Sequence, residues 1–236
     1  MELEKTIIRK IRRKLIGFRL RPIRVFCFHQ VSEEFKPETM LEGDWLQTEA
    51  FKRIILSLKG HYTFIGIQDA SRHISNDFIR LKKYAVLTAD DGWESVLNIL
   101  PWLADQQLPI VLFLNSAYLD GAVFRERETE RYLMRSDLDS IAEKYPNVSF
   151  GLHGWCHDDV TKQSENEFRD NVKRSIRSLE YYKNYVPFFA YPWGRQNSMN
   201  KRVLDAYKLI PVFMDGQKNY NGSNGIHREL LTEDCI

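Results

Sequence analysis

The segment Tyr84–Gly92 reads YAVLTADDG and joins an apolar run to two adjacent carboxylates. The apolar residues predict a buried strand over 84–88, and Asp90 and Asp91 follow directly after it. Removing charge from water is costly unless the charge is paired or bound to a metal. Gly92 then permits a sharp exit from the strand. The segment therefore predicts a strand that delivers two carboxylates to a functional site.

Two further segments place polar or aromatic groups after predicted strands. The first is His153–His157 (HGWCH), which offers two imidazoles four residues apart. The second is Phe189–Gly194 (FAYPWG), an aromatic loop stiffened by proline and glycine. The apolar runs predict strands over 24–28, 62–67, 84–88, 109–114, 148–152, 187–191 and 210–214.

Helical spacing of apolar residues predicts helices between these strands, most clearly over 48–59, 164–183 and 200–209. Short strands that alternate with amphipathic helices indicate an α/β fold with a parallel sheet. Functional residues at strand ends are typical of a (β/α) barrel, and a doubly wound open sheet would show the same pattern. Periodicity alone leaves both architectures open.

Composition describes an ordinary globular protein of 236 residues, 43% hydrophobic and 28% charged. A net charge of +2 gives no support for a nucleic-acid binder. The three cysteines form no CxxC pair or disulfide framework, which favours a reducing compartment. No apolar run reaches transmembrane length, and the basic start lacks the features of a signal peptide. A cytoplasmic location is the resulting hypothesis.

The first 23 residues are interpreted as a basic amphipathic arm, and residues 24–236 as the folded domain. Nine Lys/Arg against two Glu give residues 1–24 a net charge of +7, which leaves −5 for the rest of a chain whose total is +2. Such a helix suits peripheral contact with an anionic inner membrane surface, although the same pattern is common on solvated helices packed on their own domain.

The two histidines and the carboxylate pair suggest an open metal site. A spacing of four residues would place His153 and His157 on one face of a helical turn, so that both could bind one ion with one of the two aspartates. Three protein ligands leave room for water and substrate, as in catalytic Zn²⁺ sites. The other carboxylate could then act as general base. Zn²⁺ is the favoured cofactor, with Co²⁺, Ni²⁺ or Mn²⁺ as alternatives.

The three motifs, in this order, resemble the polysaccharide deacetylase family, the NodB-homology domain of carbohydrate esterase family 4. Thr88–Gly92 is similar to the family's T-F-D-D-G, His153–His157 to H-[ST]-x-x-H, and Phe189–Gly194 to the motif that ends in P-Y-G. The similarity spans about residues 24–230. Phe26–Val31 and Phe189–Gly194 look most like the branch that acts on poly-N-acetylglucosamine.

This resemblance implies a single-domain, distorted (β/α)7 barrel and metal-dependent removal of acetyl groups from a sugar. It also implies site roles, which are Asp90 as general base, metal ligands at Asp91, His153 and His157, and substrate contacts at Tyr191, Pro192, Trp193 and His29. For the general acid, the family carries a late histidine on an L-x-H pattern. His227 is the late candidate here, and His29 is a second one.

Three departures from the family pattern stand out. Ala89 replaces a phenylalanine, and Gly154 replaces the Ser/Thr that supports the first metal histidine. The arginine that precedes the third motif and orients the base is missing, while Arg195 follows that motif. The sequence therefore favours a deacetylase of an N-acetylhexosamine-containing glycan or sugar intermediate. A catalytically weak glycan-binding protein, or a hydrolase of a non-sugar amide, are the alternatives.

Overall fold

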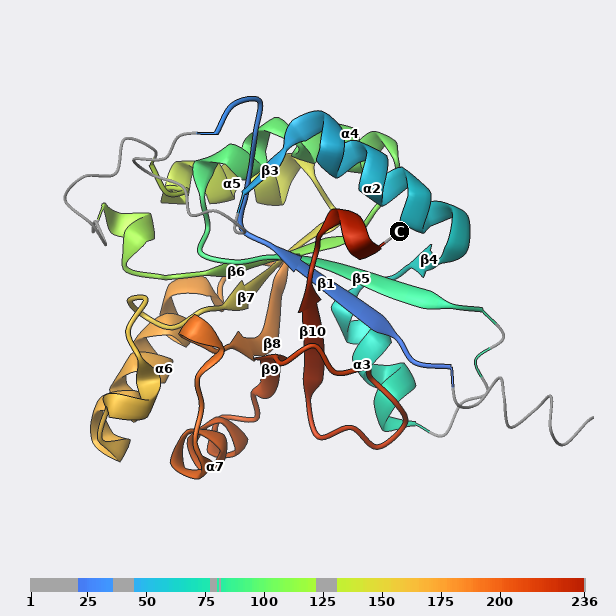
Figure 1. Ribbon diagram of the computed structural model, residues 1–236. Helices are drawn as coiled ribbons and strands as arrows, with labels where there is room; N and C mark the ends of the chain where they lie inside the picture. The colour runs from blue at the N-terminus through green and yellow to red at the C-terminus, as the bar shows by residue number, and fades with distance from the viewer. Residues whose placement is uncertain (1–20, 36–44, 77–79, 81, 122–130, 236) are drawn as a thin grey trace, which may run out of the picture.

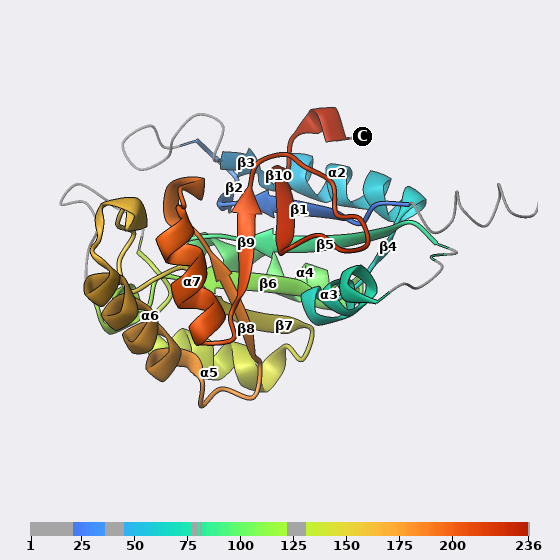
Figure 2. The ribbon, with the colours of Figure 1, turned by 90° about the horizontal axis from the view of Figure 1, so that it is seen from below.

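A computed structural model describes residues 21–35, 45–76, 80, 82–121 and 131–235. Seven parallel strands close into a barrel, which Figure 2 shows from below. In the order around the barrel they are β1 (Arg24–Phe28), β10 (Ile226–Leu230), β9 (Ile210–Met214), β8 (Tyr185–Ala190), β7 (Val148–Leu152), β6 (Ile110–Leu114) and β5 (Tyr84–Ala89). Pairing of β1 with β5 completes the ring and confirms the expected single-domain (β/α)7 barrel.

Helices cover the outside of the barrel (Figures 1 and 2). They are α2 (Thr48–His61), α4 (Leu100–Asp105), α5 (Arg135–Lys144), α6 (Glu165–Leu179) and α7 (Ser198–Ala206). In α6 the apolar spacing buries Phe168, Val172 and Leu179, and Ser164 and Glu167 form a reciprocal cap at its start. The sequence pattern therefore correctly identified the face of α6 that packs on the sheet.

The described residues form two large apolar cores. One lies between the strands and the outer helices, and the other fills the interior of the barrel. Val86, Phe113 and Phe188 belong to it, and α3 (Ile67–Ser75) packs against it at the end where the strands begin (Figure 1). Gly151 makes room for the Phe113 ring, because a Cβ at this position would lie 2.5 Å from Phe113 Cε1. Alternate residues of each strand point into this interior, and their continuation at the strand ends forms the rim of the barrel.

The structure differs from the predicted strands at two places. One predicted strand is absent from the barrel ring, and one strand that was not predicted belongs to it, so the ring still has seven strands. Residues 62–67 contribute only the two-residue strand β4 (Thr63–Phe64), which pairs with the start of β5 outside the ring. The seventh barrel strand is β10, in a segment where the sequence patterns predicted no strand. The short strands β2 (Gln30–Ser32) and β3 (Trp45–Gln47) form a separate parallel pair.

Residues 1–20 of the basic arm lie outside the described residues, so the membrane interpretation stays a prediction. Among the residues that the structure describes, no helix has the length and apolar character needed to cross a membrane.

Candidate metal and catalytic site

The three predicted metal ligands converge at the rim of the barrel. Asp91 Oδ1 lies 3.2 Å from His153 Nε2 and 3.2 Å from His157 Nε2. Asp91 follows β5 with a φ of 71°, and Gly92 follows with a φ of 81°. These two left-handed residues turn the chain out of the strand and leave the Asp91 carboxylate above its end.

The route by which His157 reaches His153 differs from the helical turn that the spacing predicted. His153 directly follows β7, and Gly154 has a φ of 86°, a conformation incompatible with a right-handed helix. Residues 155–157 form a bend instead. Gly154 thus takes over the role of a turn residue, and the two imidazoles meet because the chain folds back over the strand end.

The imidazole orientation suits metal binding. His153 Nδ1 donates to the carbonyl oxygen of Ala190 at 2.9 Å, so Nε2 is the ring nitrogen that faces Asp91 and is available to a metal ion. This main-chain acceptor supports His153 where Gly154 lacks the Ser/Thr of the family motif. One carboxylate oxygen and two imidazole nitrogens are a donor set that accepts a divalent cation, since their ligand atoms lie within 4.8 Å of one another.

The charges of these groups are strongly coupled. Burial lowers the pKa of His157 to about 4, against the attraction of Asp91, so its imidazole is neutral at physiological pH. Burial would raise the pKa of Asp91, but hydrogen bonding to His153 and the nearby His29 and His157 outweigh it and lower that pKa. Burial would lower the pKa of His153, but Asp90 and Asp91 outweigh burial and raise that pKa, so of the two imidazoles it is His157 that has the neutral form a metal ligand requires.

Asp90 is buried below this group and is held by Arg228, which the sequence interpretation missed. Arg228 Nη1 donates to Asp90 Oδ1 at 2.6 Å, and Nη2 donates to Asp90 Oδ2 at 2.7 Å. Nη1 also contacts Thr88 Oγ1 at 3.1 Å and Cys27 Sγ at 3.3 Å. The missing arginine is therefore replaced by one from β10, whereas Arg195 pairs with Asp159 at 2.7 Å.

This ion pair sets the charge of Asp90. Burial alone would raise the pKa of the carboxyl group, but Arg228, with smaller contributions from His153 and His29, outweighs burial and lowers it. Asp90 is therefore ionised, with each of its oxygens directed by one guanidinium N–H.

The two candidates for the general acid occupy different places. His29 follows β1 at the rim, where one of its ring nitrogens lies within 4.8 Å of both an Asp90 oxygen and Cys27 Sγ. His227 is the second residue of β10, beside the inward-pointing Arg228, so it faces outward. Its Nδ1 lies 2.8 Å from Asp215 Oδ2, and its ring stacks on Phe213. The structure does not bring His227 to Asp90 or Asp91.

In the aromatic loop Phe189–Gly194, some side chains lie at the site and others are buried in the core. Trp193 is 47% exposed, its ring centroid lies 4.6 Å from that of His157, and its indole N–H donates to the His157 carbonyl oxygen. Pro192 is buried and lies against the turn at Gly154. Tyr191 is also buried, packed between Phe189 and Phe213 outside the barrel. Of these three predicted substrate contacts, only Trp193 presents an exposed ring beside the metal-ligand group.

Solved structures share this architecture. IcaB from Ammonifex degensii is 20% identical with a TM-score of 0.75, over 91% of this chain and 93% of that chain. The Streptococcus pyogenes deacetylase PplD is 18% identical with a TM-score of 0.75, over 90% and 93%. A de-N-acetylase from Aggregatibacter actinomycetemcomitans is 16% identical with a TM-score of 0.72, over 89% and 94%. At these identities the likeness establishes the fold.

Comparison with protein-family models identifies the family as well as the fold. No curated protein matches the sequence. A family model described as polysaccharide deacetylase matches residues 80–212, more than half of the chain, and this range includes Asp90, Asp91, His153 and His157. The chain therefore belongs to the polysaccharide deacetylase family, as a hydrolase that deacetylates carbohydrate.

Proposed function

We propose that this protein is a metal-dependent deacetylase that hydrolyses the N-acetyl or O-acetyl groups of an N-acetylhexosamine-containing glycan or glycan precursor. The observation that carries the proposal is the group of Asp91, His153 and His157 directly beside the Asp90–Arg228 pair. The names of the structural neighbours PplD, a deacetylase, and the Aggregatibacter de-N-acetylase support the same reaction class.

The metal-ligand group would hold one divalent cation, and two imidazoles with one carboxylate suit Zn²⁺. Such a cation lowers the pKa of water and polarises a carbonyl oxygen. The residues of this chain account for the proton transfers. Asp90, kept ionised by Arg228, accepts a proton from the water that attacks the acetyl carbonyl carbon. When the C–N bond breaks, His29 donates a proton to the departing amine, and acetate is released.

We assign the general acid to His29 because geometry has priority over sequence position in such a role. A proton donor must reach the leaving group, and His29 lies on the same rim as Asp90. His227 is held on the outer side of β10 by Asp215. The exposed ring of Trp193 would contact the sugar beside the metal-ligand group.

The presence of Arg228 also bears on the glycan-binding alternative. That hypothesis rested partly on the absence of an arginine to orient the base. Since Arg228 supplies two hydrogen bonds to Asp90, the general base is oriented in this chain as a hydrolase requires.

The test measures bound metal and acetate release in purified protein loaded with Zn²⁺. Wild type should hold about one ion per chain, and Asp91→Ala and His157→Ala should lose it. His227→Ala is the matched control, because His227 and His157 have the same side-chain exposure of 13% and each lies next to an aspartate. Asp90→Asn should keep the metal and lose acetate release from N-acetylglucosamine oligomers. A wild type that binds no ion after loading would refute the proposal.

A further inference from the structure

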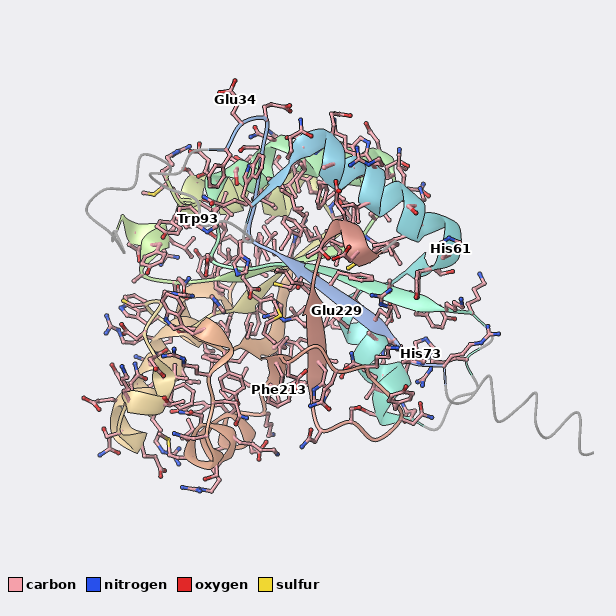
Figure 3. The ribbon with its side chains drawn as sticks, in the orientation of Figure 1. Glu34, His61, His73, Trp93, Phe213 and Glu229 are labelled. Carbon is pink, nitrogen blue, oxygen red and sulfur yellow. The ribbon has the colours of Figure 1, made fainter. Side chains whose placement is uncertain are left out.

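The metal-ligand carboxylate of Asp91 has two oxygens with different surroundings. Oδ1 faces the two imidazoles, while Oδ2 accepts a hydrogen bond from the indole Nε1 of Trp93 at 3.2 Å. An indole offers a single N–H donor in a fixed direction, so this contact restrains the rotation of the carboxylate as long as the indole itself is held. The longer contact from Asn115 Nδ2 to Oδ1, at 3.5 Å, acts on the other oxygen. Trp93 is buried at the rim of the barrel, at the end opposite His73 of α3 (Figure 3).

Trp93 is held by an aromatic stack. Its ring lies 4.3 Å from the ring of Tyr132, and Tyr132 lies 4.2 Å from Tyr118. With Ala117 these three side chains form an apolar cluster separate from both cores, and Trp155 and Cys156 pack against it. We call Trp93, Tyr132 and Tyr118 the aromatic bracket.

Main-chain contacts connect the bracket to the exit of β5. Trp93 and Tyr132 form an antiparallel bridge. Glu94 N donates to the carbonyl oxygen of Arg131 at 3.0 Å, and Leu133 N donates to that of Gly92 at 2.8 Å. The indole is therefore fixed from its backbone and from its ring face at the same time.

The far end of the bracket reaches a second predicted metal ligand. The main-chain N–H of His157 donates to the hydroxyl oxygen of Tyr118 at 3.3 Å. The same three aromatic residues thus contact Asp91 at one end and the turn that carries His157 at the other.

We infer that the aromatic bracket is a set of positioning residues that fixes Asp91 and His157 relative to one another, and so determines the affinity and coordination geometry for the divalent cation. This inference rests on the proposed metal dependence. Groups that hydrogen-bond metal ligands commonly change metal affinity by about 10–100-fold when they are removed. A cluster that served only to pack the returning segment 131–133 would affect stability and leave the affinity unchanged.

Trp93→Phe separates these two roles, because phenylalanine keeps an aromatic ring in the stack and removes the N–H donor. The matched control is Trp45→Phe, whose indole N–H donates to Ser32 Oγ at 2.7 Å on the separate β2–β3 pair. Tyr118→Phe keeps the stack and removes the acceptor for His157. Co²⁺ affinity by calorimetric titration and the visible spectrum of the Co²⁺ protein are the readouts, with circular dichroism to verify folding.

The expected result is a loss of Co²⁺ affinity of about 10–100-fold in Trp93→Phe with a changed visible spectrum. Tyr118→Phe should show a smaller loss, and Trp45→Phe should match wild type. Wild-type affinity and spectrum in both Trp93→Phe and Tyr118→Phe would overturn the inference and leave the proposed function standing. Absence of Co²⁺ binding by wild type itself would overturn both.

Discussion

Replacing Arg228 by methionine should destabilise the protein and disable its general base. The Arg228 and Asp90 side chains are 1% and 5% exposed, and the replacement leaves the Asp90 carboxylate buried without its partner. Breaking a buried ion pair by removing one member costs about 3–5 kcal/mol. For a domain of this size that loss lowers the melting temperature by about 6–20 °C.

The unfolding free energy lost in Arg228→Met should depend on pH, and the direction follows from the pKa of Asp90. In wild type, Arg228 lowers the pKa of Asp90, so the stability from this group is present above the unfolded-state pKa and decreases as the pH falls. In the variant, burial is no longer offset by Arg228 and raises that pKa. A raised pKa gives stability that is present at acid pH and lost as the pH rises. The deficit relative to wild type should therefore grow between about pH 4 and pH 7.

Urea unfolding at both pH values measures this deficit. A double-mutant cycle with Asp90→Asn isolates the interaction free energy between Asp90 and Arg228. Arg228→Lys keeps the charge but lacks the two parallel N–H donors, so it should lose less unfolding free energy than Arg228→Met. A deficit below about 1 kcal/mol, or one that shrinks towards neutral pH, would contradict the role given to Arg228.

Three further predictions follow from the packing and from the rim. Tyr191→Phe should raise the free energy of unfolding by about 1 kcal/mol in urea titration and keep acetate release, because the buried hydroxyl has no hydrogen-bond partner among the described residues. Gly151→Ala should lower the free energy of unfolding by about 1–3 kcal/mol, because the added methyl group contacts the Phe113 ring. The double variant with Phe113→Leu should recover part of this loss. His29→Gln should reduce the rate of acetate release by about 10²–10⁴-fold and His227→Gln should leave it near wild type; the reverse order would restore His227 as the general acid.

Inward and outward positions could not be distinguished from the sequence. Parallel strands in a barrel are buried on both faces, so their apolar runs show no alternation that would mark the interior. Tyr191 and His227 were expected at the site from the family resemblance, and each lies one residue from a position that does point inward, namely Ala190 and Arg228. A displacement of one residue along a strand moves a side chain to the opposite face.

The sequence by itself determined the α/β class, most strands and helices, and the convergence of the Asp90–Asp91 pair with His153 and His157. These follow from local periodicity and from the rule that parallel strands end at one edge, whereas the choice of Asp91 as the metal ligand came from the family resemblance. The tertiary structure alone decided which residues support them. Arg228 and Asp90 are 138 positions apart, and Trp93 meets Tyr132 and Tyr118 through the return of segment 131–133. Such contacts depend on the closure of the barrel and on strand register, which no local pattern in the chain encodes.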